Sequence, residues 1–205
     1  MSTPSRYAEF HRRSITDRDG FWREQAALID WHRPFDTVCD YSRPPFAHWY
    51  AGGQTNLCHN AVDRHVATRG DQNALIFVST ETNQEHCYSF RELQAEVQRM
   101  AATLQSLGVK KGDRVLVYMP MIPEAAFAML ACTRIGALHS VVFGGFASVS
   151  LASRIDDAEP VLVISADASA THQSVINAME AARRSGLSKI TFAAQSAQTA
   201  EPPGS

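Results

Sequence analysis

The chain of 205 residues has no long hydrophobic run. Its longest apolar stretch, residues 125–132, has eight residues, whereas a helix that crosses a bilayer needs about 20. The amino-terminal residues mix arginines with acidic residues and contain no apolar core, so they fit neither a secretory signal nor a transit peptide. We therefore expect no membrane partner and a cytoplasmic location.

Clusters of positive charge are also missing. The 19 Lys and Arg residues are balanced by 21 Asp and Glu, which gives a formal net charge of -2. A protein that neutralises nucleic-acid phosphates needs a concentrated basic surface. We therefore do not expect nucleic acid as a partner.

Paired cysteines are the third absence. The four cysteines are isolated and form no C-x-x-C motif: Cys39, Cys58, Cys87 and Cys132. This spacing indicates neither a disulfide framework nor a structural zinc site. The nearest group of metal-binding types is Cys58, His59 and His65, which we interpret as ordinary helix residues because a metal site needs convergent ligands. We predict no metal site.

From residue 56 onward, strand and helix patterns alternate. A helix over 56–70 is followed by a hairpin of strands 74–80 and 85–89, and Ser89 with Glu92 forms a capping box for a helix that ends at Gly108. Further strands are predicted at 114–120, 139–143, 160–167 and 189–194, with helices at 122–136, 148–158 and 174–186. The fold class is therefore α/β, with a mostly parallel sheet flanked by helices.

The first 55 residues lack this alternation. Residues 21–31 carry a stripe of Phe21, Gln25, Leu28 and Ile29 that predicts an amphipathic helix. We expect residues 42–53, SRPPFAHWYAGG, to be irregular because paired prolines and glycines interrupt them. The predicted organisation is a helical and irregular extension over 1–55, a partial α/β subdomain over 56–194, and a disordered tail over 195–205.

A glycine pair follows the strand at 139–143, in the segment VVFGGF over 141–146. Ligands of open α/β sheets bind at the carboxyl ends of the strands, and the following helix N-terminus favours an anion there. The alternative is a tight turn that needs glycine only for its geometry, and the pattern alone favours this alternative. The segment lacks the G-x-G-x-x-G spacing of a dinucleotide site, and no P-loop or nucleophile elbow occurs in the chain.

Other charged candidates are weaker. Arg134 and Arg154 are single cations in predicted helices, where such residues are usually solvated or paired at the surface. Asp156 and Asp157 are adjacent, so their side chains diverge by about 100° around a helix and do not suggest a paired-carboxylate site. We predict no catalytic residue in this chain.

Four stretches resemble the amino-terminal part of the propionate:CoA ligases, members of the adenylate-forming acid:CoA ligase family that includes acetyl-CoA synthetases. They are FWREQAALIDWHRPFDTV, SRPPFAHWYAGGQTNLCHNAVDRH, the segment from GVKKGDRV to VVFGGFA, and SRIDDAEPVLVISADA, within residues 7–168. The segment VVFGGF is similar in the acetate and propionate members. SRPPFAHWY and YMPMIPEA are more similar to the propionate members.

The resemblance implies a two-step reaction for the complete enzyme. ATP and the carboxylate, propionate or acetate, form an acyl-adenylate and pyrophosphate with Mg²⁺, and the CoA thiol then attacks to give the thioester and AMP. It also implies that Phe143, Gly144 and Gly145 border the CoA site. The glycines would let the nucleotide approach the backbone.

Parts of the family pattern have no counterpart in this sequence. The Gly-rich loop with its phosphate-binding lysine is missing, and after Ala168 the chain departs from the basic stretch that meets CoA phosphates. We therefore expect an amino-terminal fragment that is inactive alone and binds none of these ligands tightly. The alternatives are an acetyl-CoA synthetase fragment, or a non-catalytic binding or interaction module that self-associates through an exposed sheet edge.

Overall fold

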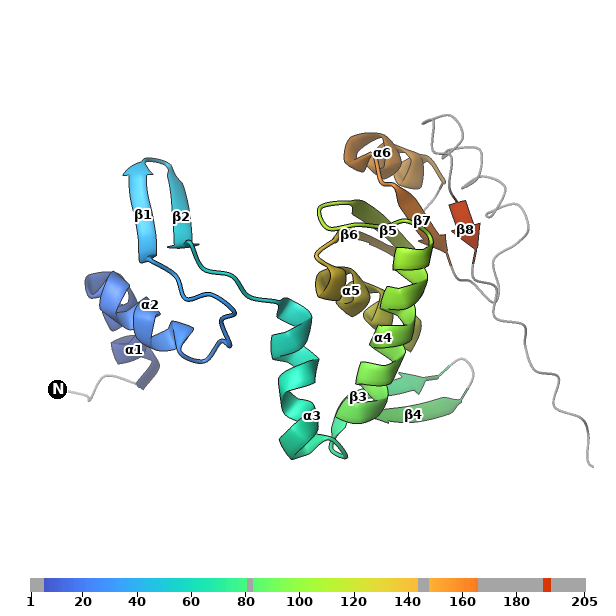
Figure 1. Cartoon of the computed structure of the whole chain (residues 1–205), viewed down its shortest axis with the longest axis horizontal. Helices are drawn as coiled ribbons and strands as arrows, with labels where there is room; N and C mark the ends of the chain where they lie inside the picture. The colour runs from blue at the N-terminus through green and yellow to red at the C-terminus, as the bar shows by residue number, and fades with distance from the viewer. Residues whose placement is uncertain (1–5, 81–82, 144–147, 166–189, 193–205) are drawn as a thin grey trace, which may run out of the picture. The chain divides into compact units, whose positions relative to one another are not determined.

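The computed structural model describes residues 6–80, 83–143, 148–165 and 190–192 (Figure 1). The chain divides into two compact units, Met1–Asn60 and Ala61–Ser205. The predicted helix at 174–186 and the predicted tail at 195–205 lie outside the described residues. Our division at residues 55 and 194 stays a prediction. No helix in the described part of the chain is long and apolar enough to cross a membrane.

The first unit begins with two short helices, α1 (Arg6–Thr16) and α2 (Arg18–Ala26). Phe21 is fully buried, and its ring meets the Phe10 ring edge-on at a centroid distance of 4.6 Å. The predicted stripe is only partly correct, because α2 ends at Ala26 while Leu28 and Ile29 remain exposed. The backbone N–H of Leu28 bonds to the Gln25 carbonyl oxygen three positions back, which marks the tightened end of the helix.

The first unit also contains a hairpin that the sequence analysis missed. Strands β1 (Thr37–Arg43) and β2 (Phe46–Ala51) pair antiparallel, with Cys39 opposite Trp49. The prediction of irregular structure over 42–53 was therefore wrong. Both prolines lie in the turn, where the Pro44–Pro45 peptide bond is cis, so they remove no hydrogen bond from the strand ladder. The aromatic residues that follow favour a strand.

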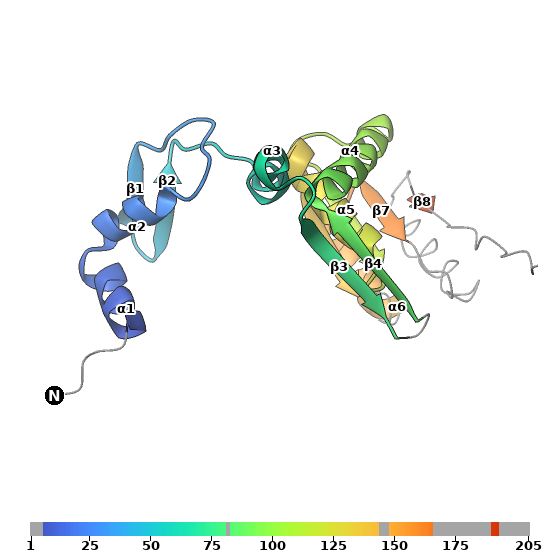
Figure 2. The same ribbon diagram turned by 90° about the horizontal axis from the view of Figure 1, so that it is seen from below.

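The second unit starts with helical turns and a hairpin. A π-helical turn, η1 (His59–Asp63), spans the division between the two units and precedes α3 (Arg64–Arg69). The Asn56 side chain accepts the His59 backbone N–H at 3.0 Å. Strands β3 (Asn73–Ser79) and β4 (Gln84–Ser89) form the predicted antiparallel hairpin. The hairpin lies beside α4 (Phe90–Ser106) in Figure 2. The predicted capping box of Ser89 and Glu92 is present at the start of α4.

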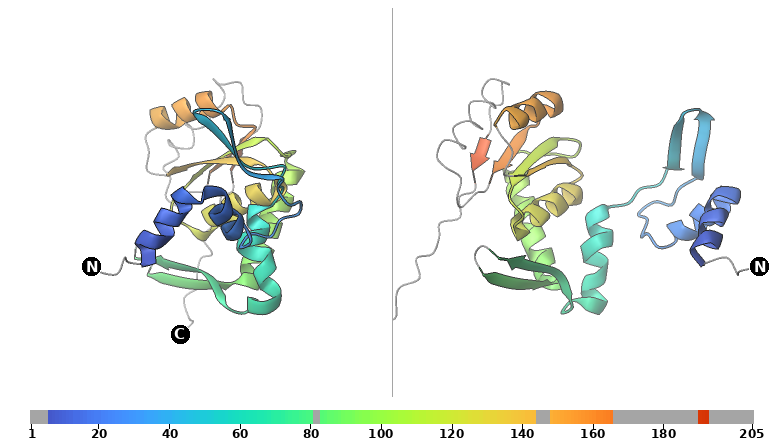
Figure 3. Two further views of the ribbon diagram at one scale, coloured as in Figure 1. Left: turned by 90° about the vertical axis from the view of Figure 1, so that its left-hand side faces the viewer. Right: turned by 180° about the vertical axis from the view of Figure 1, so that it is seen from behind.

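A parallel sheet forms the centre of the second unit, as predicted. Its strand order is β6 (Leu138–Phe143), β5 (Arg114–Met119), β7 (Leu162–Ser165) and β8 (Ile190–Phe192). The chain moves from β5 outward to β6 and then back past β5 to β7. Such crossovers are right-handed in nearly all proteins, and the reversal of direction puts α5 (Pro123–Ile135) and α6 (Ser148–Ala158) on opposite faces of the sheet (Figure 3).

Each face of the sheet has its own apolar packing. On one side, α4 packs against α5 through its buried stripe, which includes Leu93, Val97 and Leu104. On the other side, α6 contributes Leu151 and Ile155 to a cluster with strand residues. These positions give α4 one buried face.

Candidate functional site

The carboxyl ends of three parallel strands meet at one edge of the sheet. In the register of β5 and β6, Met119 lies opposite Phe143, and in that of β5 and β7, Tyr118 lies opposite Ser165. The strands therefore end almost level with one another. This edge is where an open α/β sheet places its ligands.

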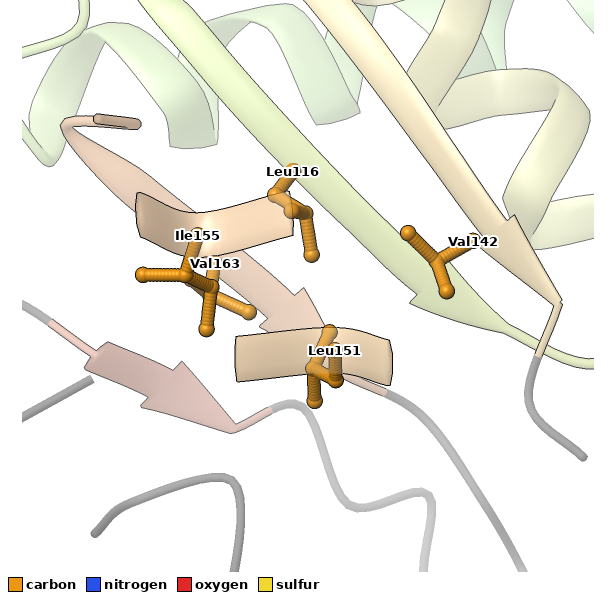
Figure 4. Packing of buried hydrophobic residues seen from close by; sticks show 5 residues of the cluster. All are labelled: Leu116, Val142, Leu151, Ile155 and Val163. Carbon is orange, nitrogen blue, oxygen red and sulfur yellow. The ribbon is translucent and has the colours of Figure 1, made fainter. Parts of the chain in front are cut away.

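Helix α6 is fixed to the sheet by a buried cluster. Leu151 and Ile155 lie one helical turn apart on α6 and are 2% and 0% exposed. They pack on strand residues from β5, β6 and β7, namely Leu116, Val142 and Val163 (Figure 4). Because one cluster joins α6 to all three strands, it determines where the helix begins relative to the strand ends.

The carboxyl end of α6 is held by Arg114, the first residue of β5. Its Nε donates to the Ala158 carbonyl oxygen at 2.8 Å, and its Nη2 donates to the Glu159 carbonyl oxygen at 2.7 Å. Carbonyl groups at a helix C-terminus lack partners within the helix and carry partial negative charge, so a guanidinium there is favourable. Arg114 thus anchors the carboxyl end of α6 to the sheet, and the buried cluster anchors its apolar face.

The predicted coenzyme-binding residues lie between these fixed elements. Phe143 is the last residue of β6, and α6 begins at Ser148. Gly144 and Gly145 lie outside the described residues, as does the Phe143 side chain. The structure thus places the backbone of Phe143 at the carboxyl edge of the sheet, while any ligand contact of Phe143 and the glycine pair stays a prediction. The amino end of α6, which follows the pair, favours an anion.

Arg134 lies away from this edge, in the last turn of α5. Its Nη1 donates to both carboxylate oxygens of Asp63, at 2.9 and 3.0 Å, and Gln94 Nε2 donates to Asp63 Oδ1 at 2.8 Å. The two charged side chains are only 24% and 20% exposed. Of the two expectations for Arg134, solvated or paired, the structure shows a pair, which is part-buried and joins η1, α4 and α5. Asp63 was not identified from the sequence, because no pattern marks a helix carboxylate with a partner 71 positions away.

The other charged candidates from the sequence, Arg154, Asp156 and Asp157, all lie on α6. Asp156 and Asp157 are adjacent and exposed on α6, and Arg154 is exposed on the same helix. Their placement agrees with the solvent-facing side of an amphipathic helix.

The cysteine and histidine residues considered as metal ligands do not converge. Cys58 is buried, His59 Nε2 lies 3.4 Å from Asp30 Oδ2, and the His65 ring packs against Phe90 at 5.1 Å between centroids. Among the residues that the structure describes, no three His, Cys, Asp or Glu side chains are grouped to hold a metal ion.

Cys132 is fully buried in α5. Burial raises the pKa of its thiol to about 11, because the charged thiolate loses its hydration. A thiol in this state stays protonated near pH 7 and is a poor nucleophile. Its contribution is to packing.

Comparison with known proteins decides the family. A family model described as AMP-binding enzyme matches residues 62–204, and one described as acetyl-coenzyme A synthetase N-terminus matches residues 7–61. The chain belongs to the AMP-binding enzyme family. The family boundary falls within one residue of the boundary between the two compact units.

Several members of the AMP-binding family are similar over most of the chain. Propionate–CoA ligase from Escherichia coli strain K12 is 57% identical over 83% of the chain, and that from Salmonella typhimurium strain LT2 is 60% identical over 80%. Acetyl-coenzyme A synthetase 2 from Pseudomonas putida is 50% identical over 80%. The chain spans only 27%, 26% and 26% of these relatives, respectively.

The fold of a solved family member agrees with this assignment. Acetoacetyl-CoA synthetase from Streptomyces lividans superposes with a TM-score of 0.83 and is 28% identical. The match covers 100% of this chain and 32% of that protein. The α/β architecture described above is therefore that of the corresponding part of an acyl-CoA synthetase.

Proposed function

We propose that this chain serves as the amino-terminal part of an AMP-forming propionate–CoA ligase. The observation that carries the proposal is its 57% and 60% identity to two propionate–CoA ligases, compared with 50% to an acetyl-coenzyme A synthetase. The match of residues 7–61 to the amino-terminal model of the synthetases supports the position within the longer protein.

In the complete ligase, the reaction has two steps. The propionate carboxylate attacks the α-phosphate of ATP with Mg²⁺ present, which forms propionyl-adenylate and releases pyrophosphate. The CoA thiolate then attacks the acyl carbon and displaces AMP, which forms propionyl-CoA. ATP, Mg²⁺ and CoA are thus required by the complete enzyme rather than held tightly by this chain.

The part of this chain that meets CoA is the turn after β6. Phe143 ends β6 at the carboxyl edge of the sheet, and Gly144 and Gly145 leave room for the nucleotide to approach the backbone. The cluster beneath α6 supports this role, because it fixes the two elements that the turn connects. Without the basic stretch expected after Ala168, CoA loses charge-assisted contacts worth about 1.5–3 kcal/mol each.

The chain alone catalyses neither step. Phosphoryl displacement needs cations around the reacting phosphate, and the sequence has no counterpart of the lysine-containing phosphate loop. Incubation of the purified chain with propionate, MgATP and CoA should release no pyrophosphate above a buffer blank. Propionate-dependent pyrophosphate would overturn this part of the proposal, and the E. coli ligase under the same conditions is the positive control.

A chimera tests the ligase assignment itself. Residues 7–168 of this chain replace the corresponding segment of the E. coli propionate–CoA ligase, and propionyl-CoA formation is measured. We expect an active chimera, because this chain and the E. coli ligase are 57% identical over an alignment of 170 residues. A folded chimera that forms propionyl-adenylate but no propionyl-CoA would contradict the proposed CoA contact. A folded chimera that forms neither product would contradict the ligase assignment.

Acetate is the rival substrate. One methylene in an acyl pocket is worth only about 1–3 kcal/mol, and the pocket lies beyond this chain. The ratio of kcat/KM for propionate and acetate, measured on the product of the gene with its flanking DNA, decides between them. A higher ratio for acetate would reject propionate.

A non-catalytic interaction module is the second candidate. The observation that favours it is the unpaired side of β6, which pairs only with β5 among the described strands. Binding of the purified chain to purified E. coli propionate–CoA ligase, measured by light scattering, tests for a heterologous partner. No complex at micromolar concentration would count against such a partner.

A further inference from the structure

Among the strands that the structure describes, β6 lies at an edge of the sheet and lacks the usual protection. Its sequence, LHSVVF, contains no Asp, Glu, Lys or Arg, whereas natural edge strands commonly carry charges or prolines that prevent pairing with another chain. Within the described part of the chain, only β5 pairs with it. The outer side of β6 therefore presents backbone donors and acceptors next to uncharged side chains.

The side chains along this edge are partly uncovered. Val141 is 48% exposed and Leu138 is 56% exposed. Val142 of the same strand is only 1% exposed, because it packs in the cluster beneath α6. An apolar side chain next to an unpaired backbone gains from a partner strand in two ways, through burial and through hydrogen bonds.

The register of β6 shows which of its backbone groups face away from β5. The Leu138 N–H donates to the Asp113 carbonyl oxygen at 2.8 Å, so the backbone N–H and C=O groups of residue 138 point toward β5. Backbone groups alternate in direction along a strand. The backbone groups that face β5 therefore belong to residues 138, 140 and 142. Those that face away from β5 belong to residues 139, 141 and 143.

We infer that β6 pairs antiparallel with β6 of a second copy of this chain, about a two-fold axis at Val141. In this register Val141 faces Val141 of the other copy, and His139 faces residue 143. Each outward residue then donates its N–H and accepts at its carbonyl group. An axis at Ser140 would instead place residue 143 opposite residue 137, which precedes the strand.

The strand is suited to its own copy rather than to a charged partner. A two-fold interface brings identical surfaces together. In the proposed register, His139 lies opposite residue 143 of the other copy and not opposite the other His139, so the pairing places no two like charges opposite each other. The formal net charge of only -2 adds little long-range repulsion between copies. This inference rests on the second candidate function, the interaction module, and is independent of ligase activity.

The first test is the mass of the chain in solution. Size exclusion with light scattering should give twice the 22.6 kDa of one chain at micromolar concentration. Val141→Lys places two ammonium groups directly opposite each other and should give a monomer. Val78→Lys is the matched control, since Val78 is 63% exposed on β3 and should leave the dimer intact. Monomeric wild-type protein, or a dimer that persists in Val141→Lys, would overturn the inference.

A second measurement does not depend on how the lysine variant folds. Cys87→Ser removes the exposed thiol, and Val141→Cys is added to that background. A short bifunctional thiol reagent should then link two copies, because opposite Cβ atoms lie about 5 Å apart in such a pair. Ile76→Cys, at a 59% exposed position on β3, should not cross-link.

Different results would overturn the pairing of two β6 strands and the interaction-module function. A dimer without a Val141 cross-link would overturn the proposed register. A monomeric chain that binds the purified E. coli ligase would overturn self-pairing while supporting the interaction module. Activity of the ligase chimera is unaffected by either result.

Discussion

Replacement of Ile155 by alanine is a direct probe of the packing that holds α6 on the sheet. Ile155 is 0% exposed and belongs to the cluster with Leu116, Val142, Leu151 and Val163. Truncation of a buried isoleucine to alanine removes apolar contacts and leaves a cavity, at a cost of about 2–5 kcal/mol. Since domains are stable by only about 5–15 kcal/mol, Ile155→Ala should remove a large fraction of the stability.

The magnitude can be measured by urea unfolding followed by circular dichroism. We expect a loss near the middle of the range, about 3 kcal/mol, and a melting temperature lower by roughly 6–12 °C for a chain of this size. Ile155→Val should cost about 0.5–1.5 kcal/mol. Asp157→Ala, at an exposed position on the same helix, should change stability by less than about 0.5 kcal/mol. A loss below about 1 kcal/mol for Ile155→Ala, with an unchanged denaturant slope, would refute the packing described for α6.

Three further predictions concern other contacts. Asp63→Ala and Arg134→Ala should each cost about 1.5–3 kcal/mol, and the double variant should cost less than their sum in urea unfolding, because both remove one ion pair; additive losses would contradict the pairing. The hydrogen bond from the Ser89 backbone N–H lowers the pKa of the Glu92 carboxyl below 4.5. The stability that ionised Glu92 contributes is therefore present above pH 4.5 and is lost as the pH falls through the folded-state pKa. Glu92→Gln should weaken the dependence of unfolding free energy on pH in that window, and an unchanged dependence would count against the capping box. A thiol reagent should modify Cys87 rapidly in the folded chain and the three buried thiols only on unfolding; rapid reaction of a second thiol would contradict their burial.

The second unit could be predicted from sequence because its local patterns agree with its packing. The capping box at Ser89 and Glu92, and the end of α5 before Gly136 with its positive φ of 77°, are short-range features that determine where helices begin and end. The strands are also apolar along almost their whole length, and this pattern predicts a parallel sheet that helices cover on both faces.

The first unit was harder to predict because its helices and strands are short, and the residues at which they begin and end follow no clear pattern. Paired prolines suggested irregular structure, although Pro44 and Pro45 only make the turn between β1 and β2. The apolar stripe continued to Ile29 in the sequence, but α2 ends at Ala26. A stripe shows which residues could share a helix face, and it does not determine where the chain turns away.

The site followed from sequence only in part. The position of Phe143 at the end of β6 was predicted from the strand pattern and is confirmed. The hydrogen bonds from Arg114 to the end of α6 were not predicted, since they join residues 44 and 45 positions apart and no local pattern identifies such partners. The role of Phe143, Gly144 and Gly145 toward CoA came from family resemblance and stays a prediction.

The most direct test of the account is the KM for CoA of the ligase chimera carrying Gly145→Val. If the turn after β6 meets the nucleotide, the added side chain should raise this KM by about tenfold or more, equivalent to at least about 1.4 kcal/mol of lost binding. Propionate-dependent exchange of pyrophosphate into ATP, which reports the first step alone, should stay within about twofold. Val78→Ala in the same chimera should change neither value. An unchanged KM for CoA in Gly145→Val, or an equal loss in both steps, would contradict the proposed CoA site at this turn.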